Sequence, residues 1–128
     1  ERYEKQIIID TYEILDRTAI KEVQLAILQL MHKKEIVIET LPTSNIYIGN
    51  HHSYTTYHLV NWIKWAKEEN PIPPIVLGTD DAGIFATNIY NEYCHIYTLL
   101  VHEYNFSTNE ALEIIKRINY NANIYSFK

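Results

Sequence analysis

Two short apolar runs separated by a long helical segment are the feature that most limits the possible folds. Residues 35–40 are rich in β-branched side chains and residues 75–78 are wholly apolar, so each predicts a short strand. Between them, apolar residues with helical spacing at 59–66 predict a helix that ends before the prolines of 71–74. Strands joined through a long helix cannot form a hairpin. We therefore expect a parallel pair with a right-handed crossover.

Three further helices are predicted from periodic apolar residues and capping signals, at residues 18–31, 84–104 and 107–118. The remaining segments are assigned as follows: 7–9 a short strand or part of an earlier helix, 41–53 irregular, and 121–127 one short turn. This order is α/β. Two parallel strands with unpaired edges do not make a stable sheet. The chain, residues 1–128, is thus expected to form a single partial domain of a larger α/β architecture.

Charge and composition exclude several classes of protein. Eleven basic and 16 acidic residues give a net charge of −5, which argues against general nucleic-acid binding and against a membrane-surface protein. No apolar stretch approaches the roughly 20 residues of a membrane span, and the first five residues do not resemble a signal peptide. Cys94, the single cysteine, has no internal disulfide partner. We expect a cytoplasmic protein in which Cys94 is a buried, inert thiol.

The strongest candidate site is the pair Asp80 and Asp81, directly after the second predicted strand and before Gly83. Ligands of α/β folds bind at the carboxyl ends of strands, so adjacent carboxylates there indicate a function. The competing interpretation is structural, because aspartate is a favoured helix cap and Asp81 precedes the helix expected from Ile84. These residues alone do not separate the two interpretations.

Three segments together resemble the C-terminal part of the adenosine deaminase family. They are Leu-Pro-Thr-Ser-Asn at 41–45, Gly-Thr-Asp-Asp-Ala-Gly-Ile-Phe at 78–85 and Asn-Glu-Tyr at 91–93. The likeness covers about residues 36–127, and the run from Gly78 looks particularly like the deaminases of prokaryotic antiviral systems. It implies a partial (β/α)8 TIM-type barrel, comprising the last two βα units and the C-terminal helices. The family's zinc-dependent reaction is hydrolytic deamination at purine C6, which releases ammonia.

The resemblance also implies roles for single residues. Asp80 matches the family's aspartate ligand to zinc, and Asp81 matches the neighbour that contacts the purine ring. A carboxylate is an acceptable zinc ligand, and a catalytic zinc ion keeps one position open for water. Residues 42–45 would shape the pocket rim or hold the strand end, without a direct part in the chemistry.

The other active-site residues of that family are absent from this chain. The family supplies a His-x-His pair, a further histidine ligand, a catalytic glutamate and another active-site histidine from earlier strands, and no segment here matches them. One carboxylate cannot form a catalytic zinc site. A replacement cluster built from His51, His52 and His58 is conceivable, but solvated loop residues or helix-start caps are favoured. His95 and His102 are expected to be exposed.

Two functions remain open at this point. In the first, the chain is the C-terminal portion of a zinc-dependent adenosine or adenine-nucleotide deaminase and is inactive by itself. Its partners would be a purine nucleoside or nucleotide and the rest of the barrel. In the second, it is a non-catalytic remnant or oligomerisation module whose open strand edges are covered by self-association or by another chain.

Overall fold

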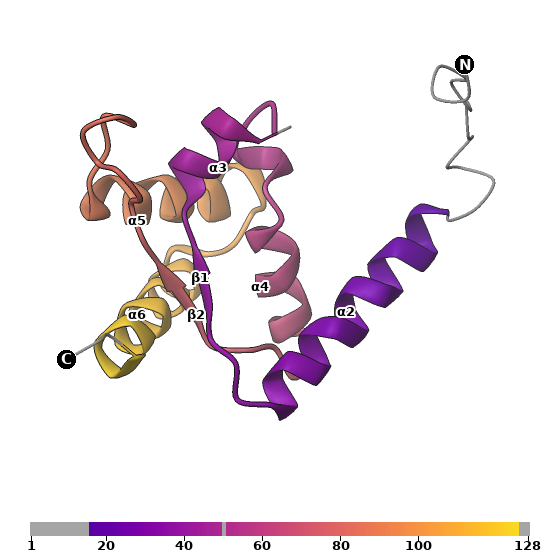
Figure 1. Cartoon of the computed structure of the whole chain (residues 1–128). Coiled ribbons are helices and arrows are strands. Elements are labelled where there is room, and N and C mark those ends of the chain that lie inside the picture. The colour runs from indigo at the N-terminus through magenta and orange to yellow at the C-terminus, as the bar shows by residue number, and fades with distance from the viewer. Residues whose placement is uncertain (1–15, 50, 126–128) are drawn as a thin grey trace, which may run out of the picture.

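The computed structural model describes residues 16–49 and 51–125; the strand or helix expected at residues 7–9 lies outside them. Figure 1 shows the elements, which follow one another in this order: α2 (Arg17–Lys33), β1 (Ile38–Thr40), α3 (Pro42–Ile48), a 3-10 turn η1 (Tyr54–Thr56), α4 (Leu59–Lys67), β2 (Ile75–Leu77), α5 (Ile89–Thr98), a π-helical turn η2 (Leu99–Glu103) and α6 (Thr108–Tyr125). The described chain is mostly helical, with a small parallel sheet. A mixed helix and strand fold is therefore confirmed.

The two strands pair as the sequence predicts. β1 and β2 are parallel, with Ile38 opposite Ile75 and Thr40 opposite Leu77. The pairing continues one residue further, because the Gly78 amide donates to the Thr40 carbonyl at 3.0 Å. A Cβ atom at Gly78 would lie 2.7 Å from the Glu39 carboxylate, which is closer than side chains pack. Any larger residue at this position would therefore require the flexible side chains of Glu39 and Leu41 to shift.

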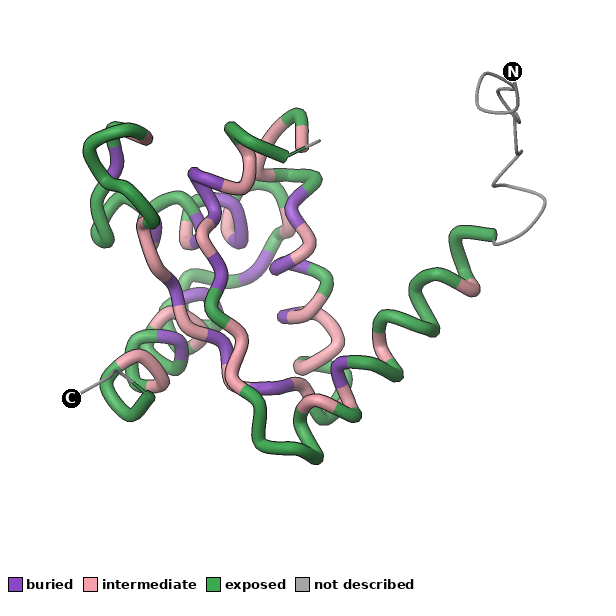
Figure 2. The backbone as a smooth tube through the Cα atoms, viewed as in Figure 1, coloured by how far each residue is buried: buried purple, intermediate pink, exposed green. Residues whose placement is uncertain are grey.

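The core lies on one face of this sheet, between the strands and helices α4, α5 and α6 (Figures 1 and 2). Its buried members are Tyr57, Leu59, Ile63, Ile75, Leu77, Ile96, Leu100, Phe106, Ala111 and Ile118. The opposite face carries Glu39, which is exposed, and Val76, which is half-buried. Among the described residues, nothing covers that face as fully as the helices cover the first.

Helix α2 projects away from this core, as the largely exposed tube in Figure 2 shows. The amphipathic helix expected at 18–31 is present, but its apolar stripe does not pack inward. Val23, Ile27 and Leu30 are each more than half exposed, and Leu28 is the buried residue of the helix. An amphipathic helix normally buries its apolar stripe, so the described chain leaves this surface without a partner.

Four features of the helices differ from the sequence predictions: one additional helix, two boundaries and one helix type. The segment expected to be irregular contains α3, because Pro42 occupies the first helical turn, where its missing amide hydrogen costs nothing. The helix expected from residue 84 begins at Ile89, after a turn that ends at Ala86 with φ 49°. Its last part, from Leu99, is π-helical. The final helix does not stop near residue 118 but continues to Tyr125.

The capping box predicted for the final helix is present. The Ser107 amide and hydroxyl donate to the Glu110 carboxylate at 2.9 and 2.7 Å, and the Glu110 amide donates back to the Ser107 hydroxyl at 3.3 Å. Lys67 of α4 forms an ion pair with Glu110 at 2.6 Å. This ion pair and the Ser107 hydrogen bonds lower the pKa of Glu110 from 4.5 to about 2. None of the helices in the described ranges is long and apolar enough to cross a bilayer.

Candidate functional site

The carboxyl ends of the two strands bring two of the sequence motifs into contact. α3 starts directly after β1, and the loop 79–88 starts directly after β2. The Ser44 hydroxyl donates to Oδ2 of Asp80 at 2.7 Å, which joins the Pro-Thr-Ser-Asn segment to the Thr-Asp-Asp segment. The carboxyl ends of parallel strands lie at the same edge of a sheet, so the topology brings these two segments close together.

Asp80 has an unusual backbone and an exposed side chain. Its φ of 57° lies in the left-handed region, which non-glycine residues adopt at some cost, although aspartate tolerates it better than most. Ser44 holds one carboxylate oxygen, which leaves Oδ1 without a hydrogen bond among the described residues. In the described ranges, no group of three or more histidine, cysteine or acidic side chains could hold a metal ion.

Asp81 organises the loop itself. Its Oδ1 accepts hydrogen bonds from the amides of Gly83 and Ile84, at 3.0 and 2.9 Å. These are the bonds expected of a capping aspartate, but they close a turn over residues 82–86 and not the first turn of a helix. Helix α5 is capped instead by Asn88, whose side chain accepts from the Asn91 amide at 3.0 Å. Like Asp80, Asp81 has an exposed side chain.

A buried carboxylate that the sequence analysis did not single out lies behind this loop. Glu92, in the first turn of α5, is 0% exposed. Its Oε2 accepts from the Thr43 amide at 3.1 Å, and its Oε1 accepts from the Thr87 hydroxyl at 2.5 Å. In the sequence, segment 91–93 is marked only by its resemblance to the deaminase family. Neither polarity nor helical periodicity indicated that its acidic residue faces inward.

Tyrosine hydroxyl groups tie the start of α3 to the segment before α4. The buried Tyr57 hydroxyl contacts the Thr40 hydroxyl and accepts from the side-chain Nδ2 of Asn45 at 2.8 Å. Tyr54 and Thr43 are joined in the same way, hydroxyl to hydroxyl, at 2.6 Å. Burial raises the pKa of the Tyr57 hydroxyl, so it stays protonated and neutral. These contacts agree with the expectation that residues 42–45 hold the end of the strand.

Within the described part of the chain, His51, His52 and His58 form no group that could hold a metal ion. The rings of His51 and His58 lie 5.6 Å apart, but His58 packs on Tyr57 and Trp62 with ring centroids at 4.3 and 4.5 Å. His58 occupies the cap position of α4 without a side-chain capping bond, while His52 is exposed. Burial, with a smaller contribution from His51, lowers the pKa of His58 below 6.5.

The long helix differs from its sequence prediction in which face it buries. His95 and His102 are exposed, as expected, and the His95 ring stacks on Tyr54 with centroids 4.7 Å apart. The expectation of a buried Cys94 is wrong, because this thiol is exposed. The helix turns Ile96 into the core, and a residue two positions earlier lies about 200° around the helix axis.

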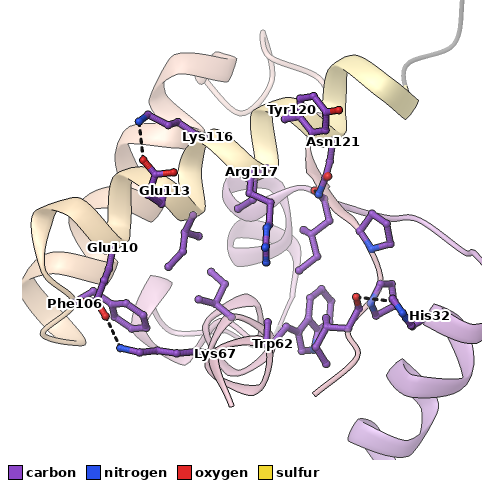
Figure 3. Close-up of a pocket in the computed structure, with 18 of the residues that line it drawn as sticks. His32, Trp62, Lys67, Phe106, Glu110, Glu113, Lys116, Arg117, Tyr120 and Asn121 are labelled. Atoms are coloured by element: carbon purple, nitrogen blue, oxygen red, sulfur yellow. Dashed lines mark hydrogen bonds and ion pairs between the residues drawn. The ribbon is translucent and has the colours of Figure 1, made fainter. Parts of the chain in front are cut away.

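A large groove lies at the other end of the molecule (Figure 3). It has a volume of about 980 Å³ and lies between α4 and α6, near Pro74 and Ile75 at the start of β2. Its walls are mainly apolar, and in Figure 3 Arg117 reaches into it from α6 toward Trp62. Asp80 and Asp81 are not among its lining residues. The groove and the strand-end motifs are therefore separate features.

No protein-family model matches this sequence, and no curated protein matches it.

Proposed function

We propose that this chain is the C-terminal part of a zinc-dependent adenosine or adenine-nucleotide deaminase, to which it contributes one metal ligand and one substrate-binding residue. The reaction is hydrolytic deamination at purine C6 with release of ammonia. The observation that carries the proposal is the Ser44–Asp80 hydrogen bond, because it links two of the resembling motifs at the carboxyl ends of paired parallel strands.

The described residues fit a shared zinc site better than a complete one. Asp80 presents one oxygen that no described residue occupies, beside a second oxygen oriented by Ser44. A metal-binding carboxylate held by such a hydrogen bond is a recurrent arrangement. Zinc supplies Lewis-acid activation of a water molecule when it is bound in such a site. The histidine ligands and the proton-transferring glutamate would come from other barrel strands, which lie outside this sequence.

Asp81 is proposed to contact the purine. Its Oδ1 is fixed by the amides of Gly83 and Ile84, so the orientation of its carboxylate is set before substrate binds. Oδ2 then remains to accept a hydrogen bond from a ring nitrogen or an amino group of the base. In this division of roles, Asp80 serves the metal and Asp81 the substrate.

The surroundings of the sheet support a larger barrel, of which these would be the last two βα units. Among the described residues, each strand has one unpaired edge, and unpaired edges invite pairing with further strands. The exposed apolar stripe of α2 would pack against a neighbouring unit of the same barrel. The proposal also places the protein in the cytoplasm, since its single cysteine gives no indication of an oxidising compartment.

The test uses the full-length protein that contains this chain. Asp80→Ala should abolish ammonia release from adenosine or adenine nucleotides and should reduce bound zinc, measured by elemental analysis. Asp81→Ala should reduce turnover while zinc stays bound, because Asp81 is assigned to the substrate. Glu113→Ala, on the exposed surface of α6, is the control and should change neither quantity.

Two results would contradict these roles. Equal zinc loss in the Asp80 and Asp81 variants would overturn the division between metal and substrate. A full-length protein without zinc and without deaminase activity would overturn the function itself.

A second candidate is a non-catalytic interaction module, which the exposed stripe of α2 favours. Ile20, Val23, Ile27 and Leu30 together form an apolar surface that self-association could cover. If the wild-type protein neither binds zinc nor releases ammonia, and if it forms dimers that Val23→Asp separates, this candidate replaces the first.

A further inference from the structure

A buried charge needs a physical reason, and Glu92 is the acidic residue among the described ones that is fully buried. Burial of a carboxylate is expensive unless hydrogen bonds compensate it. Both of its oxygens are used, one by the Thr43 amide and one by the Thr87 hydroxyl. No lysine, arginine or histidine side chain in the described ranges forms an ion pair with it. Its role is thus defined by the two groups it holds.

Those two groups belong to the two segments that meet at Asp80. Thr43 lies in the first turn of α3, immediately before Ser44, which donates to Asp80. Thr87 lies in the loop 79–88, which also contains the two left-handed residues Asp80 and Ala86. Strained backbone of this kind persists where the surrounding structure fixes it. Glu92 joins the two segments from the buried side, as the Ser44–Asp80 bond joins them from the exposed side.

We propose that Glu92 is a positioning residue, whose buried carboxylate holds the start of α3 against the loop after β2 and thereby keeps Ser44 in contact with Asp80. That Asp80 binds zinc rests on the proposed function. That Glu92 positions the Asp80 side chain rests only on the hydrogen bonds among the described residues.

Substitutions at Glu92 separate positioning from charge and from packing. Glutamine can keep both contacts, since its oxygen can accept from the Thr43 amide and its amide group can donate to the Thr87 hydroxyl. Leucine has a similar size and keeps neither. Thr87→Val removes one of the two bonds with almost no change in shape.

The experiment compares Glu92→Gln, Glu92→Leu and Thr87→Val in the full-length protein, with Glu113→Leu as the matched change at an exposed glutamate. Two quantities are measured well below the unfolding temperature. One is the carboxyl ¹³C chemical shift of Asp80 in metal-free protein, and the other is zinc affinity by chelator competition. Glu92→Leu should displace the Asp80 signal and weaken zinc binding about 10- to 100-fold, as loss of a group supporting a ligand does.

The outcomes decide the inference in either direction. The positioning role is supported if Glu92→Gln has an Asp80 chemical shift and a zinc affinity close to those of the wild type. An intermediate effect of Thr87→Val on both quantities supports it as well. If Glu92→Gln behaves like Glu92→Leu, charge is responsible and the inference is wrong. It is also wrong if folded Glu92→Leu leaves the Asp80 signal unchanged. Should Glu92→Leu not fold, the Asp80 signal in Thr87→Val decides.

Failure of the proposed function is distinguishable from failure of this inference. If the wild-type protein binds no zinc, the deaminase proposal falls, while the Asp80 chemical shift still reports whether Glu92 positions that side chain. If zinc binds and ammonia is released but the Glu92 variants match the wild type, the deaminase proposal survives and the positioning role falls.

Discussion

Tyr57 forms side-chain hydrogen bonds with two residues near the carboxyl end of β1. Its hydroxyl contacts both the Thr40 hydroxyl and the Asn45 amide, and its side chain is 1% exposed. The sequence contains eleven tyrosines and does not distinguish this one from the others. Its importance arises because the segment before α4 passes beside the end of β1, which places a phenol next to two polar side chains.

Tyr57→Phe should destabilise the protein by about 1–3 kcal/mol, because it leaves the buried Thr40 hydroxyl and the side-chain amide of Asn45 without this partner. The free energy of unfolding is measured by urea denaturation. Tyr47→Phe is the control, because Tyr47 is 76% exposed and its hydroxyl is available to water. Equal losses in the two variants would contradict the importance of the Tyr57 contacts.

Two helices end in the same way, with glutamate where glycine is usual. After α4, the Asn70 amide bonds to the Trp65 carbonyl and the Glu69 amide to the Ala66 carbonyl, at 3.0 and 3.2 Å. Glu69 has φ 63°, so this is a Schellman motif with a left-handed glutamate. The end of α2 repeats the pattern with Glu35 at φ 56°. Both helices thus form this C-terminal motif without glycine, in a sequence that has only three glycines.

Glu69→Gly is expected to stabilise the protein by about 0.5–1 kcal/mol, since relief of the left-handed strain exceeds the entropy cost of glycine. Glu68→Gly is the matched control, because Glu68 has φ −81° and gains nothing from glycine. Thermal and urea unfolding measure both variants. A loss of stability in Glu69→Gly would show that the glutamate side chain contributes more than its backbone strain costs.

The start of α5 shows why the boundaries of elements were harder to predict than their existence. Apolar residues from Ile84 onward continue the helical period, yet Ala86 adopts φ 49° and the helix starts only at Ile89. The buried hydrogen bond from the Thr87 hydroxyl to Glu92 favours this later start, because it forms with Thr87 before the helix and Glu92 in its first turn. Such a preference depends on tertiary contacts that hydrophobic periodicity does not contain.

At the scale of the whole molecule, the described chain has one well-packed side and one open side. The helices α4, α5 and α6 bury one face of the sheet, while Glu39 on the other face and the stripe of α2 face solvent. A two-stranded parallel sheet is normally part of a larger sheet covered on both faces. This asymmetry is the physical basis for proposing either further barrel strands or self-association.

Stability of the whole molecule should depend on pH through His58. Burial lowers the folded-state pKa of His58 below 6.5, so the unfolded chain binds a proton first as the pH falls. The free energy of unfolding should therefore decrease below pH 6.5 until the folded-state pKa is passed. His58→Gln should flatten this part of the profile, whereas His52→Gln, at an exposed position, should not.

Glu110 acts in a different pH range, which keeps the two effects separable. Its pKa is lowered from 4.5 to about 2, so its contribution is present above 4.5 and is lost as the pH falls toward 2. Urea unfolding at several pH values measures both ranges. An unchanged slope between pH 6.5 and 5 in His58→Gln would contradict the assignment to His58.

The sequence by itself determined the two strands, the helix between them and the parallel pairing of the strands. Apolar runs and proline breaks predicted two strands separated by a helix, and that separation required a parallel pair whose ends lie together. The proximity of the segments that follow the two strands, which contain Ser44 and Asp80, follows from this topology. The capping box at Ser107 was likewise readable, because it depends on residues three positions apart.

Only the tertiary structure decided which side chains turn inward. Glu92 and Thr43 are 49 positions apart and meet because α5 starts where it does, so no local pattern could reveal their contact. The exposure of Cys94 and of the α2 stripe has the same cause. Periodicity shows that a helix has an apolar face, but the position of the neighbouring elements determines whether anything covers it.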